Sequence, residues 1–250
     1  MKIALCIKQV PDTSVRVKLA QDGMGIDASG IEYVINPYDE YALEEAVRLK
    51  EQAAGSEITL ISLGPEKAQQ MILKALAMGA DKAVHMKVDN IPQDPLAIAK
   101  ILAEELKGGT YDIIFFGKKA VDNDNHQVGA IVAELLNLPC VTACTHYEVK
   151  DGKLTAYREI EGGVEVYEVQ FPAVFTQEKG PHEPRYPQLR ELMAARRKPI
   201  TTKLPNFSSS KAESLALSYP SARPQGKIVG KGVEAVPELI RLLREEAKVI

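Results

Sequence analysis

The first 140 residues alternate short, continuously apolar runs with longer stretches in which apolar residues recur at helical spacing. The apolar runs occupy 2–7, 57–62, 82–88 and 111–117. A strand that is apolar on both sides of its pleat has to be covered by helices on both faces of the sheet. Strands that alternate with helices of this length form crossover units, so we predict an α/β fold with a doubly wound, mainly parallel sheet.

The stretches between the apolar runs carry the start signals of helices. The helix expected over 36–52 has Pro37 and acidic residues in its first turn and basic residues near its end, as the helix dipole favours. The helix expected over 94–107 begins with Asp94 as its cap, and a third helix is expected over 65–80. These signals indicate where each helix should begin.

The pattern changes after residue 140. Two pairs typical of hairpin turns, Asp151-Gly152 and Gly162-Gly163, separate strand-like runs rich in Val, Thr and Tyr. We therefore expect an antiparallel hairpin extension to follow the parallel core.

The last part of the chain should extend away from this core. A proline-rich lead-in and a short basic helix are expected over 181–198, and the tail should end as an amphipathic helix. Between them, 199–231 has no periodic pattern, yet it contains the large apolar residues Leu204, Phe207, Leu215, Leu217 and Tyr219. Flexible linkers rarely carry so many, so we expect an arm that lies on another polypeptide. The expected organisation is a domain over 1–198 and an arm with its helix over 199–250.

The overall charge balance argues against partners recognised by charge alone. The chain has 31 basic and 34 acidic residues and a net charge of −3, which excludes a general attraction to nucleic acid or anionic membranes. Cys6, Cys140 and Cys144 form no C-x-x-C pair and lie in apolar runs, as free thiols do in a reducing compartment. No signal peptide and no apolar stretch of about 20 residues is present, so we expect a cytoplasmic protein, or one in an equivalent mitochondrial matrix.

A polar turn follows the apolar run 111–117 and precedes the next helix. It lies at the carboxyl end of a parallel strand, where open α/β sheets bind ligands, and free N–H groups at a helix start favour a phosphate. Asp124 and Gln127 fit a capping box, which would place the first helical turn there. Asp122 and Asp124 would repel a phosphate at close range, so they are expected to cap the helix or to accept from hydroxyl groups. A well-capped loop without a ligand remains the alternative.

Other chemical motifs are missing from the sequence. It contains neither a dinucleotide G-x-G-x-x-G motif nor a phosphate-binding G-x-x-x-x-G-K-[ST] loop. The four histidines are scattered without ligand spacing, so we expect no metal site, and no catalytic grouping is visible. Any redox chemistry would therefore have to come from a cofactor.

Several longer blocks carry a family resemblance. CIKQVPD (6–12), NPYDEYALEEAVRLKE (36–51), GKKAVDNDNHQVG (117–129), REIEGG (158–163) and EPRYPQLRELMAARRK (183–198) resemble, in order and spacing, the small (beta) subunit of electron-transfer flavoprotein. The resemblance implies a fold of the adenine-nucleotide alpha-hydrolase type. It also implies a large (alpha) subunit that holds the FAD, and AMP as a structural ligand of the small subunit. Such a pair is an electron carrier rather than an enzyme; it passes electrons from acyl-CoA or other flavin dehydrogenases, as in fatty acid oxidation, to a quinone oxidoreductase.

Carried over residue by residue, the resemblance assigns nucleotide contacts to four places, each a strand end or a helix start. The contacts at Cys6 and Leu63 would be apolar or made by the backbone. The full set is Cys6, Asn36, Pro37, Tyr38, Asp39, Leu63, Ala120, Val121, Asp122, Asn123, Asp124, Asn125, His126, Gln127, Val128, Gly129, Ala130 and Ile131.

The same resemblance places a docking loop for the partner dehydrogenase in the basic helix. Leu189 matches its hydrophobic anchor, and 185–198 holds five basic side chains against one acidic, including Arg190, Arg196, Arg197 and Lys198. An apolar anchor surrounded by charge suits a small, rapidly exchanging interface. The alternative is that the leucines pack on their own domain while the arginines face water. Glu159 matches an acidic position that influences the mobility of the flavin-bearing domain.

Three functions remain open at this stage. The first is the carrier subunit with structural AMP. The second is the small subunit of a bifurcating relative, in which the nucleotide site holds a second FAD that takes hydride from NADH. The third is an ATP-using enzyme of similar fold, which the missing phosphate loop disfavours.

Overall fold

Seven strands form one wholly parallel sheet in the computed structural model, which describes residues 1–150, 153–206, 210–223 and 225–250. The strands are β1 (Lys2–Cys6), β4 (Glu57–Gly64), β5 (Lys82–Lys87), β6 (Ile113–Gly117), β7 (Cys140–Cys144), β11 (Ala173–Gln177) and β12 (Ile200–Lys203). Their order is β12-β5-β4-β1-β6-β11-β7, and every neighbouring pair is parallel. The order reverses between β1 and β6, which confirms the doubly wound prediction.

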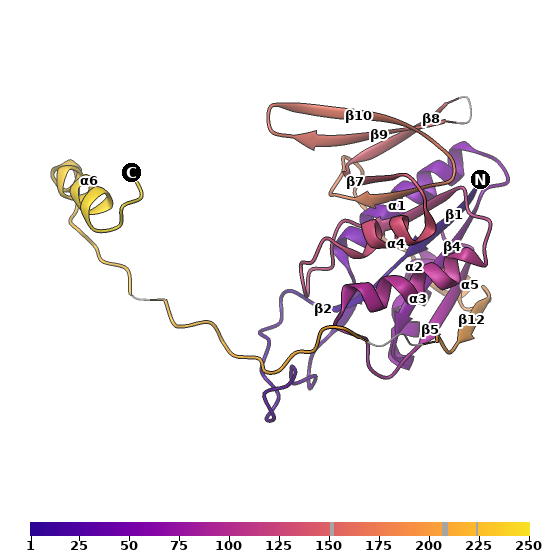
Figure 1. Ribbon diagram of the computed structural model, residues 1–250, viewed down its shortest axis with the longest axis horizontal. Coiled ribbons are helices and arrows are strands. Elements are labelled where there is room, and N and C mark those ends of the chain that lie inside the picture. The colour runs from indigo at the N-terminus through magenta and orange to yellow at the C-terminus, as the bar shows by residue number, and fades with distance from the viewer. Residues whose placement is uncertain (151–152, 207–209, 224) are drawn as a thin grey trace. The chain divides into compact units, whose positions relative to one another are not determined.

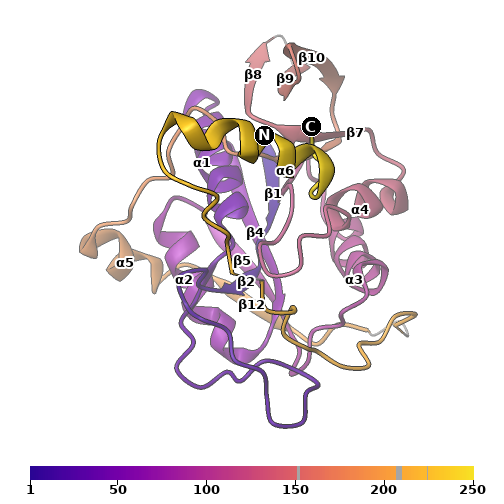
Figure 2. The same cartoon turned by 90° about the vertical axis from the view of Figure 1, so that its left-hand side faces the viewer.

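Helices cover both faces of this sheet. They are α1 (Pro37–Gln52), α2 (Gln69–Ala77) after the short 3₁₀ turn η1 (Glu66–Ala68), α3 (Pro95–Lys107) and α4 (Val128–Leu136). Figure 2 shows α1 and α2 on one side of the sheet and α3 and α4 on the other. Adjacent sheet residues therefore belong to different cores: Phe115 packs in the α1 and α2 layer and Phe116 in the α3 and α4 layer. This two-sided burial is why the strand sequences are continuously apolar.

An antiparallel extension follows β7, as the sequence predicts. It consists of β8 (His146–Lys150), β9 (Lys153–Ile160) and β10 (Gly163–Gln170), labelled in Figure 1. The expected antiparallel extension is confirmed, whereas β7 and β11, the strands on either side of it, join the parallel sheet. Parallel neighbours need a long crossover connection, and the three antiparallel strands supply it in place of a helix. The hairpin expected at Gly162-Gly163 is present: Glu161 and Gly162, the latter at φ +78°, form the turn, and Gly163 begins β10. The expected Asp151-Gly152 turn lies outside the described residues.

A second small sheet lies near the amino-terminal end. It pairs β2 (Gln9–Pro11) with β3 (Tyr33–Ile35) in antiparallel fashion. Between these strands, an isolated bridge joins Leu19 to Ile26. This pairing holds the long loop that separates β1 from α1.

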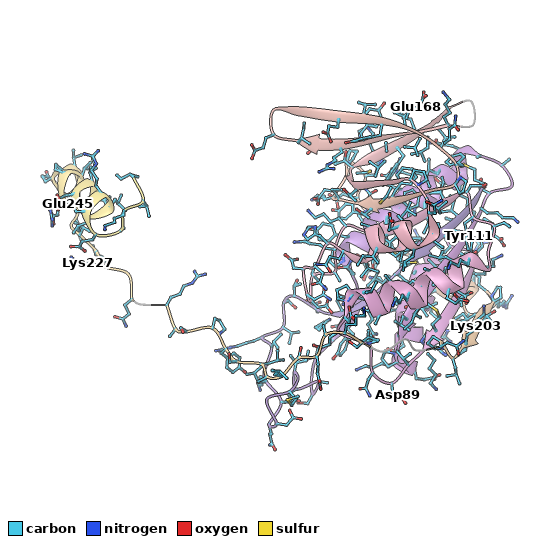
Figure 3. The ribbon with its side chains drawn as sticks, in the orientation of Figure 1. Asp89, Tyr111, Glu168, Lys203, Lys227 and Glu245 are labelled. Carbon is cyan, nitrogen blue, oxygen red and sulfur yellow. The ribbon has the colours of Figure 1, made fainter. Side chains whose placement is uncertain are left out.

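The segment after residue 180 contains more regular structure than its sequence suggests. The short helix α5 (Leu189–Ala195) lies within the predicted range, and β12 then adds a parallel edge strand to β5. Lys203, labelled in Figure 3, ties β12 to α3 through an ion pair of 2.7 Å with Glu105. The sequence of 199–231 has no periodic pattern, yet β12 forms within it. An edge strand of only four residues needs little apolar pattern of its own. Phe207 lies outside the described residues.

The chain divides into two units, Met1–Ala216 and Leu217–Ile250. The second unit contains the 3₁₀ turn η2 (Val233–Ala235) and α6 (Val236–Glu245), so the predicted tail helix is confirmed. Arg241 pairs with Glu238 and Glu245 on one side of α6, while Val236, Leu239 and Ile240 are exposed. No helix within the described ranges is both long and apolar enough to cross a membrane.

Candidate functional site

A pocket opens at the carboxyl ends of β1 and β6, where the strand order reverses. In open α/β sheets this crevice is the usual ligand site. Its lining contains both apolar and polar side chains. The apolar wall is formed by Leu63, Ile91, Ile98, Leu102, Phe116 and Val128. A flat, apolar group such as a nucleobase fits a wall of this kind.

Two buried polar side chains hold the polar wall together. Asn36 is 1% exposed and Asp39 is 5% exposed, and the Asn36 amide nitrogen donates to Asp39 Oδ1 at 2.9 Å. The same nitrogen donates to the carbonyl oxygen of Lys119 at 2.9 Å, and Asn36 Oδ1 accepts from the backbone N–H of Val121 at 3.1 Å. Asn36 therefore shapes the turn after β6, and most of its hydrogen-bonding capacity is used within the chain.

Asp39 joins three elements at the bottom of the pocket. Its carboxylate accepts from the backbone N–H of Lys8 after β1 at 2.7 Å and from that of Gly117 at the end of β6 at 3.0 Å. Burial raises the pKa of Asp39 to about 7, although these bonds and the one from Asn36 act in the opposite direction. The buried carboxyl group thus fixes the distance between the two strand ends that form the pocket.

Glycine is required at two positions of the pocket lining. A Cβ atom on Gly117 would lie 2.3 Å from Asp39 Oδ1 and 2.8 Å from the Cβ atom of Tyr38. A Cβ atom on Gly129 would lie 2.7 Å from Cγ2 of Thr176. Gly117 therefore permits the contact between β6 and α1, and Gly129 permits the close packing of α4 on the sheet.

The acidic residues of the turn are paired with lysines. Lys8 Nζ lies 2.7 Å from Asp122 Oδ2, and Lys119 Nζ lies 2.6 Å from Asp124 Oδ1. The hydrogen bond from Lys119 lowers the pKa of Asp124. The expected repulsion between these carboxylates and a phosphate is thereby reduced, because each negative charge has its own cation.

The start of α4 differs from the sequence prediction. The helix begins at Val128 with Gln127 as N-cap, so the predicted first turn near Asp124 and the Asp124/Gln127 capping box are wrong. Asp124 and His126 instead have φ values of 58° and 56°, in the left-handed region that Asp and His tolerate better than most residues. His126 therefore precedes the helix. Within the described residues, no side chain caps the first N–H groups of α4, which leaves them available to an anion beside the pocket.

The structure gathers most of the predicted nucleotide contacts in this pocket. Those that line it are Cys6, Asn36, Asp39, Leu63, Ala120, Asn123, Asn125, His126, Gln127, Val128 and Gly129. Asp122 and Asp124 lie in the lysine pairs, and Val121 contributes its backbone to the bond with Asn36. Pro37 and Tyr38 belong to the first turn of α1, and Ala130 and Ile131 continue α4.

Sequence reasoning missed part of the lining. Lys8, Lys118 and Lys119 lie directly after strands β1 and β6, so their positions at strand ends were an available signal. Ile91 comes from the loop after β5, and Ile98 and Leu102 come from α3. Helical spacing alone does not distinguish a core residue from a pocket residue, and only the packing of α3 beside the strand ends brings Ile98 and Leu102 to the pocket.

The predicted docking segment is largely exposed. Leu189 is 76% exposed and Met193 is 55% exposed, so the apolar side of α5 does not pack on its own domain. Arg190, Arg196 and Arg197 are exposed as well. Lys198 differs, because its Nζ donates to the carbonyl oxygen of Leu76 in the last turn of α2 at 2.8 Å and to that of Ala80 just after the helix at 2.6 Å.

Glu159, the predicted motion-linked residue, lies near the end of β9. Its side chain is exposed, and its register partner on β10 is Val164. Glu159 is not among the residues that line the pocket.

A doubly wound parallel sheet with a pocket at its switch point is the class of open α/β protein that binds its ligands at the carboxyl ends of the strands. Comparison with known families places the chain more closely. Residues 23–205 match the model of the electron transfer flavoprotein domain. A protein of Syntrophomonas wolfei named electron transfer flavoprotein subunit beta is 41% identical over 96% of this chain and 92% of its own length. Proteins of the same name from Bradyrhizobium diazoefficiens and Homo sapiens are 34% and 32% identical, over 100% of this chain and 100% and 99% of their own lengths. The chain therefore belongs to the electron transfer flavoprotein family, as a beta subunit.

Proposed function

We propose that the pocket holds AMP as a structural nucleotide. One observation carries this proposal. The first turn of α4 lies at the pocket beside apolar side chains, and among the described residues no side chain caps its N–H groups. A base would lie against the apolar wall, a phosphate would accept from the N–H groups of α4, and the polar turn would face the ribose.

The paired lysines favour a ligand of low charge. Lys8 and Lys119 are held by Asp122 and Asp124, and Lys118 forms an ion pair with Glu178. A triphosphate would need cations that are not already neutralised, and the chain has no phosphate-binding loop. The pocket therefore suits an adenosine monophosphate better than it suits ATP turnover.

The same observations leave one competing ligand. FAD contains an AMP moiety, so a second FAD could place that moiety on the same wall and helix start, as the bifurcating branch of the family would require. In that case the subunit would accept hydride from NADH. The two proposals differ in what the purified complex releases.

The decisive experiment is a count of released nucleotides. The heterodimer is purified without added nucleotide and denatured, and the supernatant is separated and quantified by absorbance. One FAD and one AMP per heterodimer supports the proposal, and two FAD supports the bifurcating alternative. Absence of any adenine nucleotide besides one FAD would contradict both. ATP hydrolysis by the purified chain would favour the third reading.

We further infer that the subunit works with a large, alpha subunit in a complex that contains FAD. The redox chemistry belongs to that flavin, and this chain supplies part of its enclosure and the surface for partners. Residues 200–203 of the expected arm belong to this chain's own sheet as β12. The exposed Val236, Leu239 and Ile240 of α6, and the exposed Leu204 and Leu215, support burial of the part of the arm after β12 on the large subunit.

The exposed α5 supports docking of acyl-CoA or other flavin dehydrogenases, with Leu189 as the anchor. Electrons would then pass through the flavin to a quinone oxidoreductase. An apolar helix face with arginines around it combines a central contact with electrostatic steering. Glu159 is proposed to influence the mobility of the flavin-bearing domain of the partner subunit.

A further inference from the structure

The segment that leads into α5 is fastened to α1 by ionic contacts. Glu44 and Glu45 are neighbours on α1, and their side chains are only 3% and 4% exposed. Each carboxylate meets a cationic or ionisable side chain from the segment 182–185. Buried carboxylates are stable only when they are paired and hydrogen-bonded, so these contacts are strong constraints on the segment.

Arg185 makes most of these contacts. Its Nε donates to Glu44 Oε2 at 2.8 Å and its Nη2 donates to Glu44 Oε1 at 3.0 Å, which is a two-point fork. The backbone N–H of Arg185 also donates to Glu44 Oε2 at 3.1 Å, and Nη1 donates to Glu51 Oε1 at 2.7 Å. Although burial acts in the opposite direction, the hydrogen bonds from Arg185 lower the pKa of Glu44. A planar guanidinium fixes direction as well as distance, which an ammonium group does not.

Two neighbours extend this attachment. His182 Nδ1 lies 2.7 Å from Glu45 Oε1, and the hydroxyl group of Tyr41 donates to Glu183 Oε2 at 2.9 Å. Glu45 and Tyr41 both belong to α1. The segment 182–185 is therefore attached to one helix at several points.

The helix α5 packs on its own domain along one side only. Leu189, Leu192 and Met193 stand at the i, i+3 and i+4 positions of α5, and they are 76%, 37% and 55% exposed. Ala195 is the buried residue of the helix, and α5 lies beside α2. A helix of seven residues has little stability of its own, so its orientation depends on this packing against α2 and on the attachments at its two ends.

We propose that Arg185 is a positioning residue that orients α5 through Glu44, and that this orientation sets the affinity for the dehydrogenase. The inference deepens the proposed docking function and rests on it. Lys198, whose Nζ binds the carbonyl oxygens of Leu76 and Ala80, anchors the other end. The attachment presents Leu189 to a partner without burying it in its own domain.

The chain offers a matched control for this idea. Arg48 also contacts Glu44, with its Nε 3.0 Å from Oε1, but Arg48 lies on α1 itself. Loss of Arg48 removes one cation from the same buried carboxylate and leaves the segment 182–185 attached. If Arg185 acted only as a counter-ion for Glu44, Arg185→Gln and Arg48→Gln would have similar effects.

The experiment uses the FAD-containing heterodimer with Arg185→Gln, Arg185→Lys or Arg48→Gln. Hydrogen exchange of the amides of α5 is measured by mass spectrometry. KM and kcat are measured with a flavin dehydrogenase as the donor. We expect Arg185→Gln to accelerate exchange in α5 by about tenfold or more and to raise KM by about tenfold at nearly constant kcat and FAD content. Arg185→Lys should give a smaller effect, and Arg48→Gln should leave α5 unchanged.

Equal exchange in α5 for Arg185→Gln and Arg48→Gln would overturn the inference. If the Arg185→Gln heterodimer does not assemble, Glu51→Gln takes its place, because this change weakens a contact of Arg185 from an exposed position. Unchanged α5 exchange in both Glu51→Gln and Arg185→Lys would also overturn the inference. Faster exchange in α5 together with unchanged KM in both Arg185→Gln and Leu189→Ala would support the positioning role and reject the docking function. The two failures are therefore distinguishable.

Discussion

The amide nitrogen of Asn36 lies 2.9 Å from Asp39 Oδ1, and both side chains are buried where β1 and β6 end. Asn36 continues the connection to the carbonyl oxygen of Lys119 and the N–H group of Val121. A pair of residues three positions apart therefore controls a turn more than 80 residues further along the chain. The shape of the pocket depends on this connection.

Asn36→Ala should release the turn after β6 and leave Asp39 with one donor fewer. We expect the free energy of unfolding to fall by about 2 kcal/mol, the cost of leaving buried polar groups unsatisfied, and the retained nucleotide to decrease. Urea unfolding and nucleotide counting check both effects. Asn90→Ala, at an exposed position, is the control. Full nucleotide retention in Asn36→Ala would show that the turn holds its shape without this side chain.

The buried Asp39 should make stability depend on pH. Burial raises its pKa to about 7 in the folded protein, against about 3.9 in an unfolded chain. Between these values the folded protein binds more protons than the unfolded chain, so this group's contribution to the free energy of unfolding should decrease as the pH rises from about 5 to about 8.

Asp39→Asn removes this titration and should flatten the decrease, as measured by urea unfolding at several pH values. Asp89→Asn, at an exposed site labelled in Figure 3, should keep the wild-type profile. The same slope in Asp39→Asn and in the wild type would assign the pH dependence to another group.

Gly117→Ala tests the close contact between β6 and α1. The new Cβ atom would lie 2.3 Å from Asp39 Oδ1, so the strand end or the carboxylate has to move. We expect a loss of about 1–3 kcal/mol in the free energy of unfolding, as for other overpacked sites, together with loss of nucleotide. Gly163→Ala is the matched control, because no atom lies within 4 Å of its added Cβ. Thermal unfolding of both variants gives the comparison.

Leu189→Ala tests the proposed anchor. Because the side chain is 76% exposed, its removal should change the free energy of unfolding by less than about 0.5 kcal/mol. Electron transfer from a flavin dehydrogenase should weaken by about tenfold or more in kcat/KM, as for loss of an interface hot spot, while FAD content stays constant. Met24→Ala, at another exposed apolar site, should leave the coupling intact. Unchanged coupling in Leu189→Ala would remove this residue from the docking surface.

The start of α4 shows where sequence reasoning fails. Asp124 and Gln127 have the spacing of a capping box, but Asp124 pairs with Lys119 and the helix begins later, at Val128. A cap is a local signal, and a nearby lysine competed for the same carboxylate. The sequence also does not show that β7 and β11, on either side of the antiparallel extension, join the parallel sheet, since a short buried strand does not encode the direction of its neighbour.

The sequence by itself determined the parallel core, the helices around it and the edge of the sheet where the polar turn lies. These features follow from apolar periodicity, which each segment carries within its own residues. Only the tertiary structure decided the partners of the polar groups. Lys8 meets Asp122 across 114 positions of sequence, and Arg185 meets Glu44 across 141. The packing of elements brings such charges together, and a pattern of neighbouring residues contains no information about that distance.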